Sequence, residues 1–262
     1  MTEREAVVST YTEDETSRLE LIWGEGFLSP GGPAEVARIL AGRDVRGQEV
    51  LDIGCGIGGV DLVLVRDHGA AVVTGIDVQQ SLLDVAAERA RRAGLGDRVA
   101  YRFIEPGPLP FLDESFDVVF SKDAIIHVGD KPALYRECFR VLRPGGALLV
   151  GDWLRGEGDE LTARVEAFVA EAGHVFVMRT LAETGRIVAD AGFRDVELED
   201  RHGWYQAEAE RELARLRGPM RPEFVRLHGE EATEAEVGFW QVLVATLDEG
   251  ALRPGHVRAR KP

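Results

Sequence analysis

The chain has 262 residues, a formal net charge of −15 and a hydrophobic content of 45%. This length suits one α/β domain with an elaborated end, and the apolar fraction is sufficient for a large core. The acidity argues against nucleic acid as a partner, because binding to phosphates requires basic surface. The two cysteines exclude a disulfide framework. The N-terminus lacks the features of a signal peptide, and no apolar stretch approaches membrane-spanning length. We therefore expect a soluble cytoplasmic protein, either a monomer or a homodimer, without a membrane partner.

The first part of the chain is not sheet-like. Residues 17–22 are expected to be helical, and the glycine-rich run 23–32 ends that helix. Apolar residues stand among these glycines, so the segment either packs on the domain or covers a ligand. Residues 33–41 are predicted to form a helix with Pro33 in its first turn.

Strands and helices then alternate. Each strand is a short apolar run, and each helix carries apolar residues at helical spacing. The predicted strands are 49–53, 71–76, 99–104, 116–120 and 147–150, with helices up to residue 68 and over 82–93 and 133–142. A turn is expected at 144–146, where proline precedes two glycines. This alternation predicts a doubly wound, mostly parallel α/β sheet.

The alternation changes after Asp152. Helices are predicted over 161–172, 181–191, 207–216 and 234–247, with strands at 196–198 and 256–259. The late helices are expected to cover the carboxyl edge of a seven-stranded sheet. We divide the chain into a lid segment (1–32), a donor-binding core (33–155) and a helical roof with the last strands (156–262).

The chain is organised around residues 50–59, where an apolar strand ends and four glycines follow within six positions. Such a turn lets a ligand approach the backbone, and the amides at the start of the next helix are expected to face it. Asp77 ends the second strand, where an acid can accept both hydroxyls of a ribose. The spacing of Gly54, Gly56 and Gly58 is tighter than the G-x-G-x-x-G of NAD enzymes, and no second dinucleotide half follows.

The runs 50–59, 75–77, 116–119 and 142–146 resemble, in order, the motifs of class I S-adenosylmethionine-dependent methyltransferases. The resemblance implies that S-adenosylmethionine is the cofactor and that the glycines border its methionine and ribose. It also implies that Asp77 binds the ribose hydroxyls, that Val78 lies against the adenine, and that Glu105 accepts from the adenine amine.

Beyond the fourth strand, Asp123 and His127 are four residues apart, so one helical turn would place them on a common face. The run 121–127 is similar to phosphoethanolamine N-methyltransferases, as is the segment from Tyr11 to Gly32. This similarity implies that Tyr11 pairs with His127 and closes over the substrate. It also implies that Leu28, Ser29, Ser121 and Lys122 lie at the donor.

The chain departs from that family where tyrosines and an arginine hold the substrate phosphate. The corresponding residues here are Trp153, Phe168, Ala172 and His174. Because these side chains lack the hydroxyls and the guanidinium, a phosphobase substrate is not expected. Trp153 and Phe168 would instead suit an apolar acceptor.

Two histidines, His127 and His174, could hold a divalent metal such as zinc or iron, with His228 as a third candidate ligand. A metal would chelate an α-keto acid and stabilise its enolate. The chain is also similar to α-keto acid C-methyltransferases of secondary metabolism, which make β-methyl amino acid precursors. C-methylation of an α-keto acid is therefore the leading expectation, with His127 or Asp123 as the base.

Three alternatives stay open. The first is metal-independent N-methylation of a small amine of phosphoethanolamine or glycine type, in which Asp123 orients the ammonium and His127 with Tyr11 takes its proton. The second is a catalytically silent protein that binds the donor. The third is an NAD-linked oxidoreductase.

Overall fold

Seven strands form one sheet in the order β3-β2-β1-β4-β5-β7-β6. The computed structural model describes residues 10–262, apart from the side chain of residue 171, so the first nine residues of the predicted lid and the signal-peptide expectation lie outside it. Strands β1 to β5 are parallel, and β7 runs antiparallel to both β5 and β6. The strand bounds are β1 Glu49–Ile53, β2 Val72–Asp77, β3 Val99–Phe103, β4 Phe116–Lys122, β5 Leu142–Asp152, β6 Arg194–Asp200 and β7 Gly255–Arg260.

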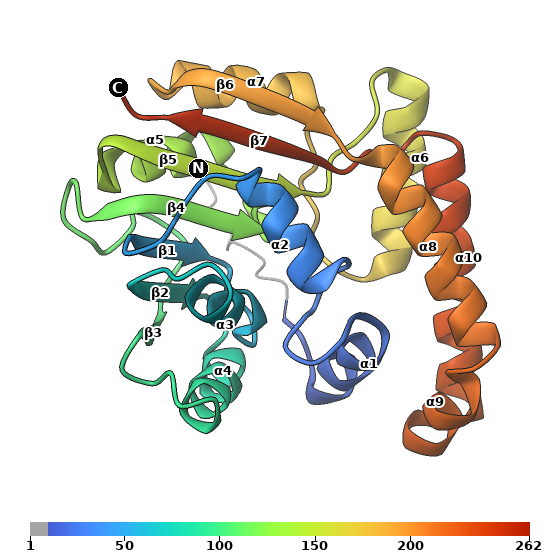
Figure 1. The fold of residues 1–262 in the computed structure, drawn as a ribbon. Helices are drawn as coiled ribbons and strands as arrows, with labels where there is room; N and C mark the ends of the chain where they lie inside the picture. The colour runs from blue at the N-terminus through green and yellow to red at the C-terminus, as the bar shows by residue number, and fades with distance from the viewer. Residues whose placement is uncertain (1–9) are drawn as a thin grey trace, which may run out of the picture.

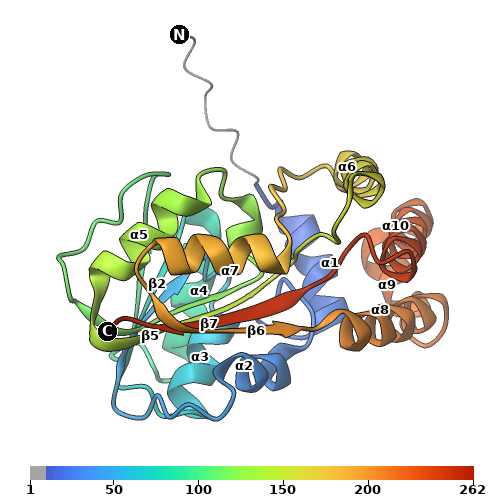
Figure 2. The ribbon, with the colours of Figure 1, turned by 90° about the horizontal axis from the view of Figure 1, so that it is seen from above.

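Helices cover both faces of the sheet. In Figure 2, where the sheet is seen nearly edge-on, α5 and α7 lie on one face and α2 and α3 on the other. One core packs β1, β2 and β4 against α2, α3 and α4, and a second packs the opposite face against α5 and α7. These helices are α2 Gly32–Leu40, α3 Gly59–Arg66, α4 Gln80–Arg92, α5 Lys131–Val141 and α7 Leu181–Asp190. Burial on both faces explains why the central strands β1 and β4 are rich in apolar residues, whereas the edge strand β6 is largely charged and exposed.

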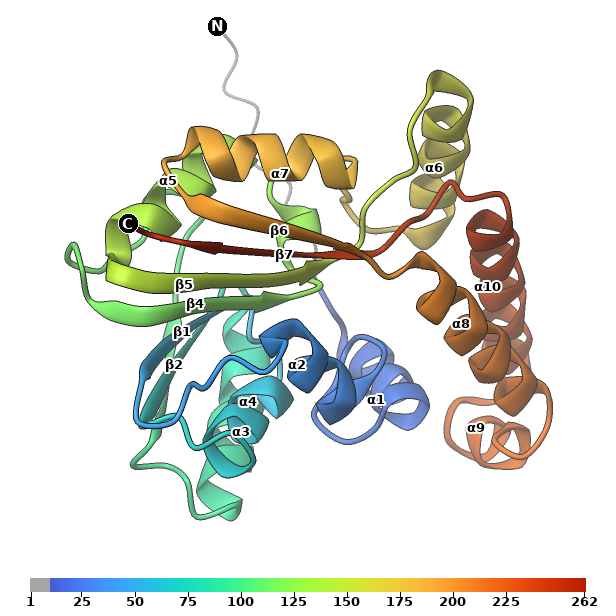
Figure 3. The same cartoon turned by 45° about the horizontal axis from the view of Figure 1, so that its top comes forward.

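The remaining helices stand beyond the carboxyl ends of the parallel strands. Figures 1 and 3 show α8, α9 and α10 grouped there, with α6 beside them and α1 between this group and the sheet. They share a third core with Trp153 of the β5 end. Their bounds are α1 Glu13–Trp23, α6 Asp159–Ala172, α8 His202–Arg217, α9 Arg221–His228 and α10 Glu230–Asp248. Among residues 10–262, no helix is long and apolar enough to cross a membrane.

The structure confirms the predicted fold class, a mostly parallel seven-stranded α/β sheet with helices over its carboxyl edge. The predicted turn at 144–146 is wrong, because these residues lie inside β5. Phe116 pairs with Leu142 and Val118 with Ala147, so extra β5 residues form a bulge opposite β4. The three-part division of the chain stays a prediction.

Candidate active site

The glycine turn lies at the point where the strand order reverses. β1 has β2 on one side and β4 on the other, so a crevice opens outside the carboxyl ends of β1 and β4. Gly54 has a φ of +73°, and a Cβ on it would lie 2.2 Å from the Cβ of Ala124 in the segment after β4. Only glycine fits this close approach. The turn and the segment after β4 are therefore in direct contact.

Asp77, at the end of β2, is held beside this turn by two backbone amides. Its Oδ2 accepts from Gly56 N and its Oδ1 from Gln79 N, each over 3.0 Å. Burial raises the pKa of this carboxyl, and the hydrogen bonds from the backbone amides oppose that rise. The position agrees with the ribose-binding role that the sequence predicts. Glu105, the predicted adenine contact, is exposed in the loop after β3.

The expectation that the amides at the start of the next helix face a ligand is wrong for Gly59 N, and four amides of the preceding turn also donate to protein oxygens. Gly59 N, at the start of α3, donates to Gly26 O over 3.1 Å, so the lid segment covers this helix end. The others are Gly54 N and Cys55 N to Ile76 O, Gly56 N to Asp77, and Gly58 N to Cys55 O. The lid is thus joined to the turn by backbone contacts.

The predicted donor contacts of the lid and of β4 differ in their surroundings. Leu28 and Ser29 line a cavity of about 260 Å³. Lys122 is buried, and its Nζ binds Asp123 over 2.8 Å and the hydroxyl of Ser29. Ser121 is fully buried, and its hydroxyl donates to Ile53 O over 2.8 Å. This hydrogen bond joins β4 to β1, so Ser121 has a role inside the sheet.

Asp123 and His127 both line the cavity, but they do not share a helix face as expected. Asp123 has a φ of +56°, in the left-handed region, and precedes a short 3₁₀ helix, η1 Ile125–His127. A non-glycine residue in this region is uncommon, and aspartate is among those that tolerate it best. The Lys122 ammonium and Gly151 O, which accepts from Asp123 N, hold this conformation.

His127 is fixed in one tautomer. Its Nδ1 lies 2.9 Å from Val175 O, and a carbonyl can only accept, so the proton is on Nδ1. Its Nε2 therefore carries the lone pair and lies 3.4 Å from the hydroxyl of Tyr11. Burial lowers the pKa of His127 and raises the pKa of Tyr11, so the imidazole is neutral and the phenol keeps its proton.

His174 lies on the same side of the cavity. Its ring stacks on Tyr11 with centroids 4.8 Å apart, and its centroid is 6.3 Å from that of His127. His228, the third predicted ligand, is not in the cavity lining, and its Nδ1 binds Asp14 over 2.9 Å. Within the described part of the chain, no group of three or more His, Cys, Asp or Glu is placed to hold a metal. These residues therefore do not fit a three-ligand metal site.

Only some of the residues predicted to contact an apolar acceptor line the cavity. Trp153 and Ala172 line the cavity, whereas Phe168 lies behind Trp153 with ring centroids 6.4 Å apart. The sequence did not indicate the other aromatic residues of the lining. The missed lining residues are Trp23, Phe176, Phe239 and Trp240. The regular apolar spacing along α10 did not show which side would face a cavity.

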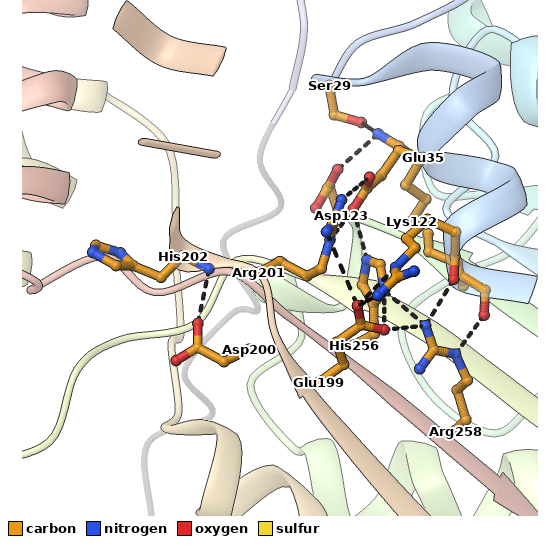
Figure 4. Close-up of polar contacts among 12 residues, drawn as sticks. Ser29, Glu35, Lys122, Asp123, Glu199, Asp200, Arg201, His202, His256 and Arg258 are labelled. Atoms are coloured by element: carbon orange, nitrogen blue, oxygen red, sulfur yellow. Dashed lines mark hydrogen bonds and ion pairs between the residues drawn. The ribbon is translucent and has the colours of Figure 1, made fainter. Parts of the chain in front are cut away.

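Near the segment after β4, a network of ion pairs joins α2 to β6 and β7 (Figure 4). Glu35 accepts from His256 Nε2 over 2.8 Å and from Arg201 over 2.7 Å. Burial alone would raise the pKa of Glu35, but these hydrogen bonds lower it to about 2. Arg258 binds Glu199 over 2.7 Å. His256 is thus structural.

The sheet order, the glycine turn with its facing acid, and the aspartate beyond β4 define the methyltransferase fold that binds S-adenosylmethionine. Residues 51–150 match the family described as "Methyltransferase domain". Residues 51–150 therefore form a methyltransferase domain, and the fold is that of the class I S-adenosylmethionine-dependent methyltransferases.

Among its relatives, phosphoethanolamine N-methyltransferase 1 of Arabidopsis thaliana is 34% identical over 86% of this chain and 44% of the relative. The phosphoethanolamine N-methyltransferase of Plasmodium falciparum is 25% identical over 96% of this chain and 93% of that protein. The chain spans about half the length of most of the curated relatives it matches.

A solved structure of a phosphoethanolamine N-methyltransferase 2 from Haemonchus contortus, in complex with phosphomonomethylethanolamine and S-adenosylhomocysteine, has the same fold. Its TM-score is 0.88 at 29% identity, over 96% of this chain and 58% of that one.

Proposed function

We propose that this chain transfers a methyl group from S-adenosylmethionine to the nitrogen of a small-molecule amine, without a metal. The carrying observation is the arrangement of Asp123, His127 and Tyr11 around one end of the cavity, with the lone pair of His127 Nε2 on the side of Tyr11. The relatives named phosphoethanolamine N-methyltransferases support the same class of reaction.

In this proposal the amine enters as an ammonium ion, and the carboxylate of Asp123 attracts and orients it. His127 Nε2 then takes one N–H proton, which leaves a nucleophilic lone pair on the nitrogen. The hydroxyl of Tyr11 covers the reacting nitrogen and excludes water. When bound, S-adenosylmethionine supplies a sulfonium methyl group, and the sulfur keeps the electron pair of the broken C–S bond as S-adenosylhomocysteine. The product is the N-methylated acceptor in its protonated form.

The rival reading, C-methylation of an α-keto acid, requires a metal that holds the substrate. The distance between the rings of His127 and His174, and the position of His228 outside the cavity lining, give it less support than the amine reading. Because the imidazole of His127 donates Nδ1–H to a carbonyl, only its Nε2 could bind a metal, and it could not then act as the base.

An acceptor screen distinguishes the two reactions. Purified protein is incubated with S-adenosylmethionine and either amines or α-keto acids, with and without EDTA, and the products are identified by mass spectrometry. N-methylated products that form equally well in EDTA are the expected result. Methylation of keto acids alone, abolished by EDTA, would replace this proposal with the C-methylation reading.

A further inference from the structure

The acceptor cavity extends well beyond the residues that would handle the proton. Its volume is about 260 Å³, and from Asp123 and His127 it continues between helices α1 and α10. The lining residues on these two helices are Glu15, Arg18, Leu19 and Trp23 on α1 and Ala232, Ala235, Glu236, Phe239 and Trp240 on α10. An acceptor that reaches His127 therefore has room for a substituent on its far side.

This far part of the cavity has aromatic walls that are fixed in place. The rings of Trp23 and Trp240 have centroids 5.7 Å apart, and Phe239 packs edge-on against Trp240. Both indole N–H groups donate to one buried carboxylate, Glu212, over 2.7 and 3.1 Å. Because both indoles are anchored at their polar edges, their apolar surfaces are preorganised for a ligand.

The charges of the lining favour a cation over a phosphate. Glu15, Asp123 and Glu236 contribute three carboxylates, and Arg18 is the sole lysine or arginine among the described lining residues. The guanidinium of Arg18 is already held by Glu236 over 3.0 Å and by Asp14. A phosphate dianion would have to compete with these two acids for its one guanidinium. An ammonium would meet three lining carboxylates, of which Asp123 is paired with Lys122 and Glu236 with Arg18.

We infer, on the basis of the proposed amine N-methylation, that the acceptor is an amine with an aromatic or branched alkyl substituent that lies between α1 and α10. Its ammonium lies at Asp123 and His127, and its apolar group packs against Trp23, Phe239 and Trp240. Apolar burial against fixed rings then contributes the affinity that a phosphate contact would otherwise supply.

Three amines that carry a phenyl ring, a hydroxyl group or a phosphate test this inference: 2-phenylethylamine, ethanolamine and phosphoethanolamine. We expect kcat/KM for 2-phenylethylamine to exceed that of each of the others by at least tenfold. Equal values, or a preference for phosphoethanolamine, would overturn the inference.

Variants that fill the far part of the cavity sharpen the test. Ala232→Phe on α10 is expected to lower kcat/KM for 2-phenylethylamine at least tenfold more than for ethanolamine. Ala235→Phe tests the same wall at an exposed position, where the larger side chain does not disturb the core. Ala214→Phe, exposed on α8 outside the cavity lining, is the matched control and should leave both values unchanged.

Calorimetry separates the failure of this inference from the failure of the proposed function. The same amines are titrated into protein saturated with S-adenosylhomocysteine. If ethanolamine is methylated but the apolar amine is neither preferred nor bound more tightly, the inference fails and the proposed function stands. If no amine is methylated but 2-phenylethylamine binds and Ala232→Phe abolishes binding, the proposed function fails and the ligand class stands.

Discussion

The side-chain amide of Gln79 and the backbone of Tyr11 exchange two hydrogen bonds. Tyr11 N donates to Gln79 Oε1 over 2.8 Å, and Gln79 Nε2 donates to Tyr11 O over 2.6 Å. The backbone N–H of Gln79 donates to Asp77, the predicted ribose ligand. The tyrosine that is proposed to cover the acceptor is thus attached to Gln79, whose backbone supports Asp77.

Replacement of Gln79 by leucine is predicted to misplace Tyr11 without loss of the fold. The apolar side chain keeps a similar volume but leaves both backbone groups of Tyr11 without their partners. Since small displacements of catalytic groups are costly, we expect kcat to fall by about tenfold or more. Steady-state kinetics with an amine that the wild-type protein methylates measure the fall in kcat.

The neighbouring Gln80→Leu is the matched control. Gln80 is exposed, and its amide donates to Asp84 on the same helix, so this variant should retain wild-type kinetics. Equal losses in both variants would show that α4 itself is damaged, and an unaffected Gln79→Leu would show that Tyr11 does not depend on this contact.

Tyr11 and His127 are predicted to act as one unit. His127→Asn removes the proton acceptor and should lower kcat by about 10²–10⁴-fold, and Tyr11→Phe by a smaller factor. Because the two groups touch, the double variant should lose less than the product of the two single losses. His68→Asn, a half-buried histidine far from the cavity lining, is the control for a general histidine effect. Fully multiplicative losses would contradict the pairing.

The sequence predicts the fold and the donor side of the site because both depend on local patterns. Apolar runs, the glycine turn and the acid after β2 follow each other within the βαβ unit. The conformation of Asp123 was not predictable in this way, because its φ of +56° depends on Lys122 and on the neighbouring strand β5.

The contacts that join distant segments were also missed. Gln79 meets Tyr11 across 68 residues, and Glu212 meets Trp23 across 189. A glutamine at the start of a helix and a glutamate within one are ordinary in sequence, so no pattern marks them. Only the packing of α1 against the sheet edge and the roof helices shows their roles.

The pH dependence of catalysis should report the environment of His127. Burial lowers its pKa below the ordinary value of 6.5, so the imidazole stays neutral and able to accept a proton in mildly acidic solution. We expect the acid limb of the kcat/KM profile to fall below pH 6.5. A limb above that value would assign the base to another group.

Two carboxyl groups are buried together under the glycine turn. Asp52 and Asp61 have no exposed carboxyl oxygen, and the hydroxyl of Tyr101 is a neighbouring donor to Asp61, so we expect the buried pair to retain a proton. Burial raises the pKa of Asp52 to about 7 and that of Asp61 well above its ordinary value. The folded protein therefore binds protons that the unfolded chain releases near pH 4.

This pair is predicted to make the protein less stable as the pH rises from about 4 through 7. In that range the folded state binds more protons than the unfolded state, so the free energy of unfolding falls with pH. Asp52→Asn supplies a permanent N–H donor to Asp61 and removes one buried charge. We expect it to raise the free energy of unfolding at pH 8 by roughly 2 kcal/mol relative to wild type, with little difference at pH 4. Urea denaturation at both pH values, with the exposed Asp97→Asn as control, measures the effect. Parallel pH dependence in wild type and Asp52→Asn would show that the shared proton does not govern stability.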